Sequence, residues 1–206
     1  GVPSWSYAAG LDLSSCDMEG ELEFSMIAYT EVQKIDGKTG RLISSTTTKA
    51  FAYEHTVGFA ENWLGWFNFK VACDCNKDEP PSKRAQECVS APELYLKSAT
   101  ERECDAIVAG GDMQSMKAGS VCVEVVENML DVVFTADEHW SLIRSQLWVG
   151  EGDKTALDAL PVKKSGVPDT KKFQNFACDW KGEKTVSFHL NLNYHCVDMK
   201  TIKINV

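Results

Sequence analysis

Alternation of apolar and polar residues, repeated along the chain, constrains the fold more than any other feature of this sequence. A first stretch lies at residues 21–28, where apolar side chains occupy every even position. Similar stretches lie at residues 121–125, 130–134, 142–149, 186–192 and 202–206. Because successive side chains of a strand point to opposite faces, this period of two predicts strands that each bury one face. The chain is therefore expected to be all-β.

Turn signals separate these stretches. Residues 36–40, Asp-Gly-Lys-Thr-Gly, predict a hairpin whose second strand begins near Arg41, and Glu127 with Asn128 predict another turn. A series of short strands separated by turns favours an antiparallel β-sandwich, Ig-like or jelly-roll-like, with loop insertions. The insertions are expected at residues 76–92, with a short helix near 83–88, and at residues 154–160, as one helical turn capped by Asp153.

The length of 206 residues and the 44% hydrophobic content suit one sizeable core. We therefore divide the chain into an N-terminal extension, residues 1–15, and a single elaborated domain, residues 16–206. Trp140 and Trp148 are expected to anchor the core, and Gly150 and Gly166 to mark turns that need a permissive backbone.

Eight cysteines without metal-ligand or redox spacing predict a disulfide-stapled protein of an oxidising compartment. Cys73 and Cys75 stand two residues apart, which in a strand aims both sulfurs to one face and favours bonds to two different partners. The pairing itself stays open. The eight disulfide candidates are Cys16, Cys73, Cys75, Cys88, Cys104, Cys122, Cys178 and Cys196.

The formal net charge of −9 argues against nucleic acid and anionic membrane surfaces as partners, since either needs a basic patch. No stretch approaches the roughly 20 apolar residues of a membrane span, and the chain begins without a signal peptide, as a mature secreted form would. One basic cluster is expected to be a solvated loop. It comprises Lys163, Lys164, Lys171 and Lys172.

Motifs of catalysis, phosphate binding and metal binding are not found in the sequence, so no catalytic residue, cofactor or metal site is predicted. The paired carboxylates of a glycoside hydrolase could come from Glu54, Glu61 or Asp131, but the sequence selects no pair. A glycoside-active enzyme is therefore the third of three functional hypotheses.

A series of short motifs between residues 106 and 180 carries a resemblance. They are Ala109-Gly110-Gly111, Val121-Cys122-Val123, Leu130-Asp131-Val132-Val133-Phe134, Trp140-Ser141-Leu142, Leu147-Trp148-Val149-Gly150, Pro161 and Gly166-Val167-Pro168. This segment resembles an uncharacterised extracellular β-sandwich domain of bacterial and microalgal surface and matrix proteins. The resemblance implies a secreted β-domain and supplies no catalytic residue. The chain departs from that pattern at Lys171-Lys172-Phe173, where the family carries Gly-Gln-Phe.

Two surface features suggest contact with glycans. Trp63 and Trp66 belong to a crowded aromatic stretch, and an exposed tryptophan could stack on a sugar, although a second core layer is the alternative. A hydroxyl-rich strand could carry O-linked glycan or be a plain edge strand. It comprises Ser44, Ser45, Thr46, Thr47 and Thr48, and the chain holds no Asn-x-Ser/Thr acceptor.

The N-terminal segment is nearly uncharged and ends just before the first cysteine. We expect residues 2–13 either to pack on their own sheet or to dock into a neighbouring copy, the residues concerned being Val2, Trp5, Tyr7, Leu11 and Leu13. A head-to-tail contact of this kind propagates as a filament. The first hypothesis is therefore a non-enzymatic extracellular structural protein whose partner is itself, with a groove lined by residues such as Trp66, Phe67 or Val186. A carbohydrate-binding or adhesion module is the second.

Overall fold

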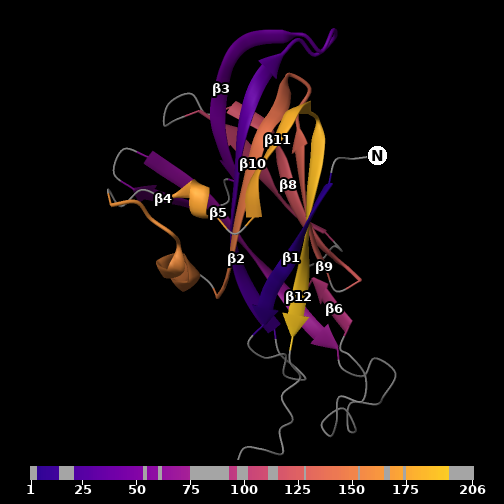
Figure 1. Cartoon of the computed structure of the whole chain (residues 1–206), viewed down its shortest axis with the longest axis vertical. Helices are drawn as coiled ribbons and strands as arrows, with labels where there is room; N and C mark the ends of the chain where they lie inside the picture. The colour runs from indigo at the N-terminus through magenta and orange to yellow at the C-terminus, as the bar shows by residue number, and fades with distance from the viewer. Residues whose placement is uncertain are drawn as a thin grey trace, which may run out of the picture.

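The computed structural model describes residues 4–13, 21–52, 55–59, 62–74, 93–96, 102–110, 116–127, 129–152, 154–164, 168–173 and 175–194. Strands dominate this part of the chain, as the alternation predicts (Figure 1). The strands are β1 (Ser4–Leu13), β2 (Glu21–Ile35), β3 (Leu42–Ala52), β4 (His55–Phe59), β5 (Asn62–Asp74), β6 (Glu93–Leu96), β7 (Arg102–Ala109), β8 (Met116–Val126), β9 (Met129–Ala136), β10 (Trp140–Glu151), β11 (Asn175–Glu183) and β12 (Thr185–Tyr194). Two short 3₁₀ helices are η1 (Lys154–Ala159) and η2 (Thr170–Lys172).

The strands form one sheet in the order β1-β12-β9-β8-β7-β3-β2-β10-β11, with β5 on the first half of β2 and with β4 and β6 on β5. All described pairings are antiparallel except β1 with β12, which is parallel. β11 and β12 follow each other in the chain, yet they lie toward opposite ends of this path. The sheet therefore curves until its ends approach, and the fold is a nearly closed, barrel-like antiparallel sheet.

The expectation of an all-β, antiparallel fold is confirmed. The expectation of two separate sheets is met in part, because the two layers that face each other belong to one continuous sheet. β3 joins the layers along one side through its short pairing with β7, where Ala50 lies opposite Ala109. Curving one sheet in this way leaves fewer open edges than two stacked sheets would.

The main core fills the space between the layers. β9 shows the predicted pattern without a break, since its residues alternate between half-buried and buried along the whole strand. Phe134 on β9 meets Phe188 on β12 edge to face, with ring centroids 5.7 Å apart, and Phe24 stacks on Phe69 at 5.4 Å. These contacts combine apolar burial with favourable ring geometry.

A second, smaller apolar cluster lies on the opposite face of β2 and β10. Within β2, Met26 and Ala28 belong to the main core, whereas Ile27 and Tyr29 belong to this second cluster. Trp148 joins the second cluster and Trp140 the main core, so both predicted anchors are confirmed as buried. The second cluster comprises Ile27, Tyr29, Phe51, Trp66, Trp148, Leu160 and Phe173. This part of β2 is thus buried on both faces.

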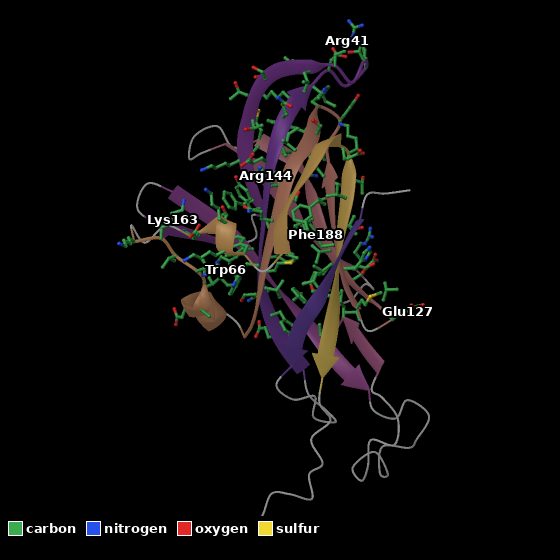
Figure 2. All side chains as sticks on the ribbon, in the orientation of Figure 1. Arg41, Trp66, Glu127, Arg144, Lys163 and Phe188 are labelled. Atoms are coloured by element: carbon green, nitrogen blue, oxygen red, sulfur yellow. A yellow bond between two sulfur atoms is a disulfide. The ribbon has the colours of Figure 1, made fainter. Side chains whose placement is uncertain are left out.

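The predicted β2–β3 hairpin is confirmed, and its turn is held by Asp36. One carboxylate oxygen of Asp36 accepts hydrogen bonds from the backbone N–H groups of Lys38 and Thr39 and from the Thr39 hydroxyl. These bonds, the backbone bond from Thr39 first, lower the pKa of the exposed Asp36 carboxyl below its ordinary value. Arg41 marks the far end of this hairpin, which extends beyond the rest of the sheet (Figure 2).

Gly150 differs from the prediction made for it, and Gly65 occupies a position that has no room for a side chain. Gly150 does not mark a turn: it pairs with Ser25 inside the β2–β10 ladder, and the positive φ of 108° falls on Gly152 instead. Gly65 on β5 lies so close to β3 that a Cβ there would stand 1.4 Å from the carbonyl oxygen of Ala52. A side chain at position 65 would therefore push the two strands apart.

The predicted helical turn after β10 is present as η1, while Asp153 lies outside the described residues. The predicted loop helix at 83–88, the closing strand at 202–206, and Gly166 also lie outside them. Of the helical segments in the described residues, none has the length and apolar character needed to span a membrane.

Candidate functional site

The outer face of the layer formed by β7, β8, β9 and β12 carries a row of polar residues. Register places Arg102 opposite Glu124, Glu124 opposite Asp131, and Asp131 opposite His189. On the next strand, β1, Ser6 is in register with His189. Residues directly opposite each other share a sheet face, so this outer-face row brings four strands into one line of ionisable groups.

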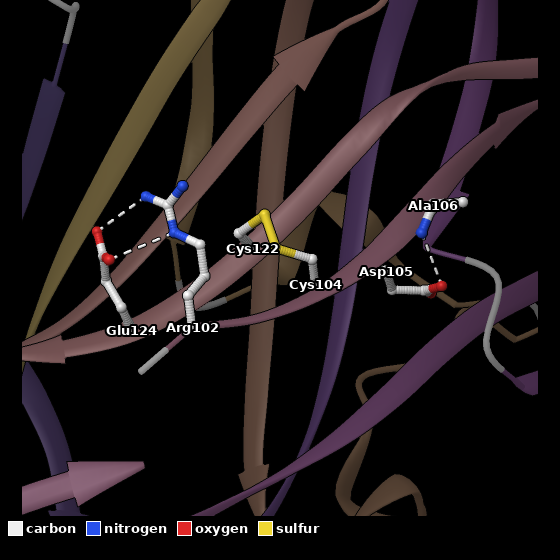
Figure 3. The surroundings of a disulfide bond; sticks show 6 residues. All are labelled: Arg102, Cys104, Asp105, Ala106, Cys122 and Glu124. Carbon is white, nitrogen blue, oxygen red and sulfur yellow. Dashed lines mark hydrogen bonds and ion pairs between the residues drawn. A yellow bond between two sulfur atoms is a disulfide. The ribbon is translucent and has the colours of Figure 1, made fainter. Parts of the chain in front are cut away.

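Arg102 closes one end of the outer-face row. Its Nη2 and Nε atoms donate to the two carboxylate oxygens of Glu124, at 3.1 and 3.3 Å (Figure 3). Because both side chains are partly exposed, at 47% and 29%, this pair adds little stability. It does neutralise Glu124, which would otherwise stand as a like charge directly opposite Asp131.

Asp131, His189 and Ser187 form a hydrogen-bonded chain at the other end of the row. Asp131 Oδ1 lies 2.6 Å from His189 Nδ1, and His189 Nε2 lies 3.5 Å from Ser187 Oγ. An ionised carboxylate can only accept, so Nδ1 carries the proton, and in the neutral imidazole Nε2 then faces Ser187 as an acceptor. The Ser187 hydroxyl is the donor in this arrangement.

A disulfide joins Cys104 on β7 to Cys122 on β8, next to the outer-face row (Figure 3). The two residues are directly opposite in the ladder, with a Cα–Cα distance of 4.0 Å. This pair confirms disulfide bonding. Of the other predicted cysteines, Cys73 and Cys178 lie on β5 and β11 with side chains outside the description, and Cys16, Cys75, Cys88 and Cys196 lie outside the described residues.

The N-terminal extension forms β1 and pairs with β12 of the same chain. The register sets Trp5 opposite Phe188, Tyr7 opposite Leu190, and Ser6 opposite His189. Apolar positions of β1 thus meet buried positions of β12, and polar positions meet the outer-face row. Between Tyr7 and Leu11 the register shifts, so that three residues of β1 stand against one of β12. Leu11 and Leu13 pair beyond this bulge, while Val2 lies outside the described residues.

The structure tests one of the two tryptophans that were predicted to contact glycans. Trp66 is 6% exposed and packs in the second cluster, which overturns the interpretation of it as an exposed sugar-stacking residue (Figure 2). Phe67 and Val186, with Trp66 the expected lining of a docking groove, are also buried. Phe67 and Val186 point into the main core between the layers, whereas Trp66 points to the opposite face, where Leu160 and Phe173 cover it. Trp63 lies on β5 with its side chain outside the description.

The hydroxyl-rich stretch lies on β3, in the part of the hairpin that extends beyond β7. Ser45, Thr46 and Thr47 are exposed, whereas Ser44 and Thr48 are half-buried.

The basic cluster is exposed as expected, at Lys163, Lys164, Lys171 and Lys172.

Of the three candidate carboxylates, Asp131 belongs to the outer-face row, and Glu54 and Glu61 lie outside the described residues. No group of three or more His, Cys, Asp or Glu side chains that could hold a metal ion occurs in the part of the chain that the structure describes. His189 and Ser187 were not predicted as site residues. Alternation assigns both to the polar face of β12, but their partner Asp131 is 58 residues away from His189 and is reached only through the strand register.

Comparison of the chain with protein-family models, with curated proteins and with solved structures found no match. Function is therefore inferred from two features of this chain, the edge strand β1 and the outer-face row beside it.

Proposed function

We propose that this protein is a subunit of an extracellular filament or matrix, assembled when β1 of one copy docks beside β12 of the next. The observation that supports the proposal is the position of β1. It ends the strand order at one edge, and among the described strands it pairs with β12 alone. Backbone bonds to β12 can be made equally well by a neighbour's identical strand.

The residues that stand opposite each other on β1 and β12 support the same proposal. Trp5 and Tyr7 stand opposite Phe188 and Leu190, while Ser6 stands opposite His189. A shift by one residue would set apolar positions against polar ones, so the register is specified. In such an assembly β1 of one copy would take the place of the next copy's own β1 beside β12. Exchange of this kind is head to tail and therefore grows as an open filament unless the rotation closes a ring.

Several features fit an extracellular setting. The Cys104–Cys122 disulfide favours an oxidising compartment, and the resemblance to surface and matrix domains points the same way. The two facing layers enclose one core, which is compatible with an elaborated sandwich of the Ig-like or jelly-roll-like kind. The exposed hydroxyls of Ser45, Thr46 and Thr47 are accessible for O-linked glycan, as a surface glycoprotein would need.

The experiment compares the full chain with a variant lacking residues 1–13. Both are concentrated under oxidising conditions, then followed by sedimentation and electron microscopy. We expect polymers from the full chain and folded monomers from the variant, because the variant keeps β12 but has no strand to donate. A synthetic peptide of residues 1–13 is expected to bind the variant and to restore its resistance to unfolding.

A matched control removes exposed apolar side chains elsewhere. Leu42 and Ile43 are 61% and 65% exposed near the end of the β2–β3 hairpin, and the double change to alanine tests whether they drive association instead. We expect this control to polymerise like the full chain. Polymers of the truncated variant, or a full chain that remains monomeric at all concentrations, would contradict the proposal.

A further inference from the structure

The hydrogen-bonded chain Asp131–His189–Ser187 has the order of groups found where a serine hydroxyl is activated for nucleophilic attack. We propose that Ser187 is a nucleophile activated by His189, with Asp131 as the positioning residue, and that it accepts acyl groups from esters. This activity goes beyond the assembly function and does not depend on it.

The first support is the direction of the hydrogen bonds that link Asp131, His189 and Ser187. The short Asp131–His189 contact of 2.6 Å fixes the proton on Nδ1 and leaves the lone pair of Nε2 on the side of Ser187. A general base must be within reach of the proton that it removes. The 3.5 Å between Nε2 and Ser187 Oγ is long for a resting hydrogen bond but closes with a small rotation of the serine side chain.

The second support is the rigid placement of the three groups. Asp131 and His189 are directly opposite on paired strands, and Ser187 is two residues from His189 on the same face of β12. The side chains of His189 and Asp131 are 25% and 17% exposed, whereas Ser187 is buried, with 7% exposed. Partial burial strengthens the electrostatic effect of Asp131 on the imidazole.

The proposed reaction is acyl transfer in two steps. Ser187 Oγ attacks the ester carbonyl carbon and forms a new C–O bond, while its proton passes to His189 Nε2. The bond from the carbonyl carbon to the alcohol oxygen then breaks, and the leaving alcohol takes the proton back from His189. Water, activated by the same nitrogen, hydrolyses the acyl-serine and releases the carboxylic acid.

The surroundings of Ser187 restrict the substrate class. Its backbone lies between β9 and β1, in register with Val133 on one side and Ser4 on the other. Amide groups committed to strand pairing are poor donors for a developing oxyanion, which in efficient hydrolases supplies a large part of the rate. We therefore expect reaction with esters of good leaving groups, and slow turnover compared with dedicated hydrolases.

The test treats the full-length oxidised protein with two serine-directed probes, phenylmethanesulfonyl fluoride and an alkyl fluorophosphonate, and locates the adduct by peptide mass spectrometry. We expect one adduct, on Ser187, and release of 4-nitrophenol from 4-nitrophenyl acetate above the buffer rate. Because the adduct is located in the unaltered protein, this arm of the test does not depend on the folding of any variant.

Variants then test whether labelling of Ser187 depends on activation of its hydroxyl by His189. Ser187→Ala is expected to abolish labelling, and His189→Gln to slow it by about 100-fold or more, the usual contribution of a positioned base. Asp131→Asn should slow labelling, and Asp131→Glu should restore part of the rate, a rescue that a merely structural role of Asp131 would not give. Ser45→Ala and His139→Gln, which alter an exposed hydroxyl and an exposed imidazole outside the row, are expected to label like the unaltered protein.

Labelling of several serines at similar rates, labelling that persists at full rate in His189→Gln, or no adduct on Ser187 with either probe would overturn the proposal. None of these outcomes bears on strand docking, which is measured by polymer formation and not by serine chemistry.

Discussion

Lys184 Nζ donates a hydrogen bond to the backbone carbonyl oxygen of Trp140, at 2.5 Å. The same ammonium group donates to the carbonyl oxygens of Asp137 and Glu138, each at 2.8 Å. Lys184 stands between β11 and β12, and the three carbonyls belong to the turn that joins β9 to β10 and to the first residue of β10. One side chain therefore ties together the two connections that pass between the layers of the sheet.

Replacing Lys184 with methionine should loosen these two connections. Methionine keeps most of the apolar stem but cannot donate to the carbonyls, so we expect a loss of about 1–2 kcal/mol in the free energy of unfolding, a discounted value for a partly solvated group. Urea unfolding followed by tryptophan fluorescence measures the change. The matched control is Lys172→Met, an exposed lysine of η2. Equal stability of Lys184→Met and the unaltered protein would contradict the role assigned to this side chain.

The pH dependence of the Asp36 turn has a definite sign. The pKa of Asp36 is lowered in the folded state by its bonds to Thr39 and Lys38. Its contribution is therefore present above the unfolded pKa, near 3.9, and is lost as pH falls through the lower folded pKa. We expect Asp36→Ala to be less stable than the unaltered protein at pH 7, and the difference to shrink as the pH falls below the unfolded pKa. Unfolding by urea at pH 7 and at acidic pH checks this, and a difference that persists unchanged in acid would contradict it.

Phe188 is one of the fully buried phenylalanines of the main core, and its loss should cost stability. It is fully buried and contacts Phe134 edge to face. Phe188→Ala should lower the free energy of unfolding by about 3–5 kcal/mol through lost burial and the cavity left behind. Leu42→Ala serves as the control, since that leucine is exposed, and should change stability by less than about 0.5 kcal/mol. A small effect at Phe188 would show that the core between the layers is not closely packed there.

The disulfide prediction concerns two residues on adjacent strands. Cys104 and Cys122 are separated by 18 positions, and closing a loop of this length stabilises a fold by roughly 3 kcal/mol in the chain-entropy account. The double change of both residues to alanine should lower stability by up to that amount, since the β7–β8 ladder itself remains. Thermal unfolding of the double variant and of the unaltered protein, both under oxidising conditions, measures the effect of this bond. An unchanged melting temperature in the double variant would refute it.

The sequence predicts individual strands better than their assembly. Alternation correctly assigned Phe188 to the core and Ser187 with His189 to the outer face, because that choice depends on neighbouring residues alone. It could not show that Asp131 stands beside His189, since the pairing of β9 with β12 is decided by long-range register. The burial of Trp66 also depends on distant residues, because Leu160 and Phe173 complete the second cluster around it. Gly150 looked like a turn glycine, yet β10 continues through it because β2 is long enough to pair there.

A peptide copying residues 1–13 should compete with the docking of β1 between copies. In the monomer β1 is held at high effective concentration by its own chain, so free peptide is expected to act only on strands that have left β12 and on polymer ends. Polymer growth, followed by light scattering, should slow as peptide concentration rises. A peptide with proline at the position of Ser6 is the control, because proline lacks a backbone donor and disturbs a paired strand, and it should compete far less well. Equal inhibition by both peptides would mean that the effect does not arise from strand pairing, and unimpeded growth with either would indicate that copies associate through another surface.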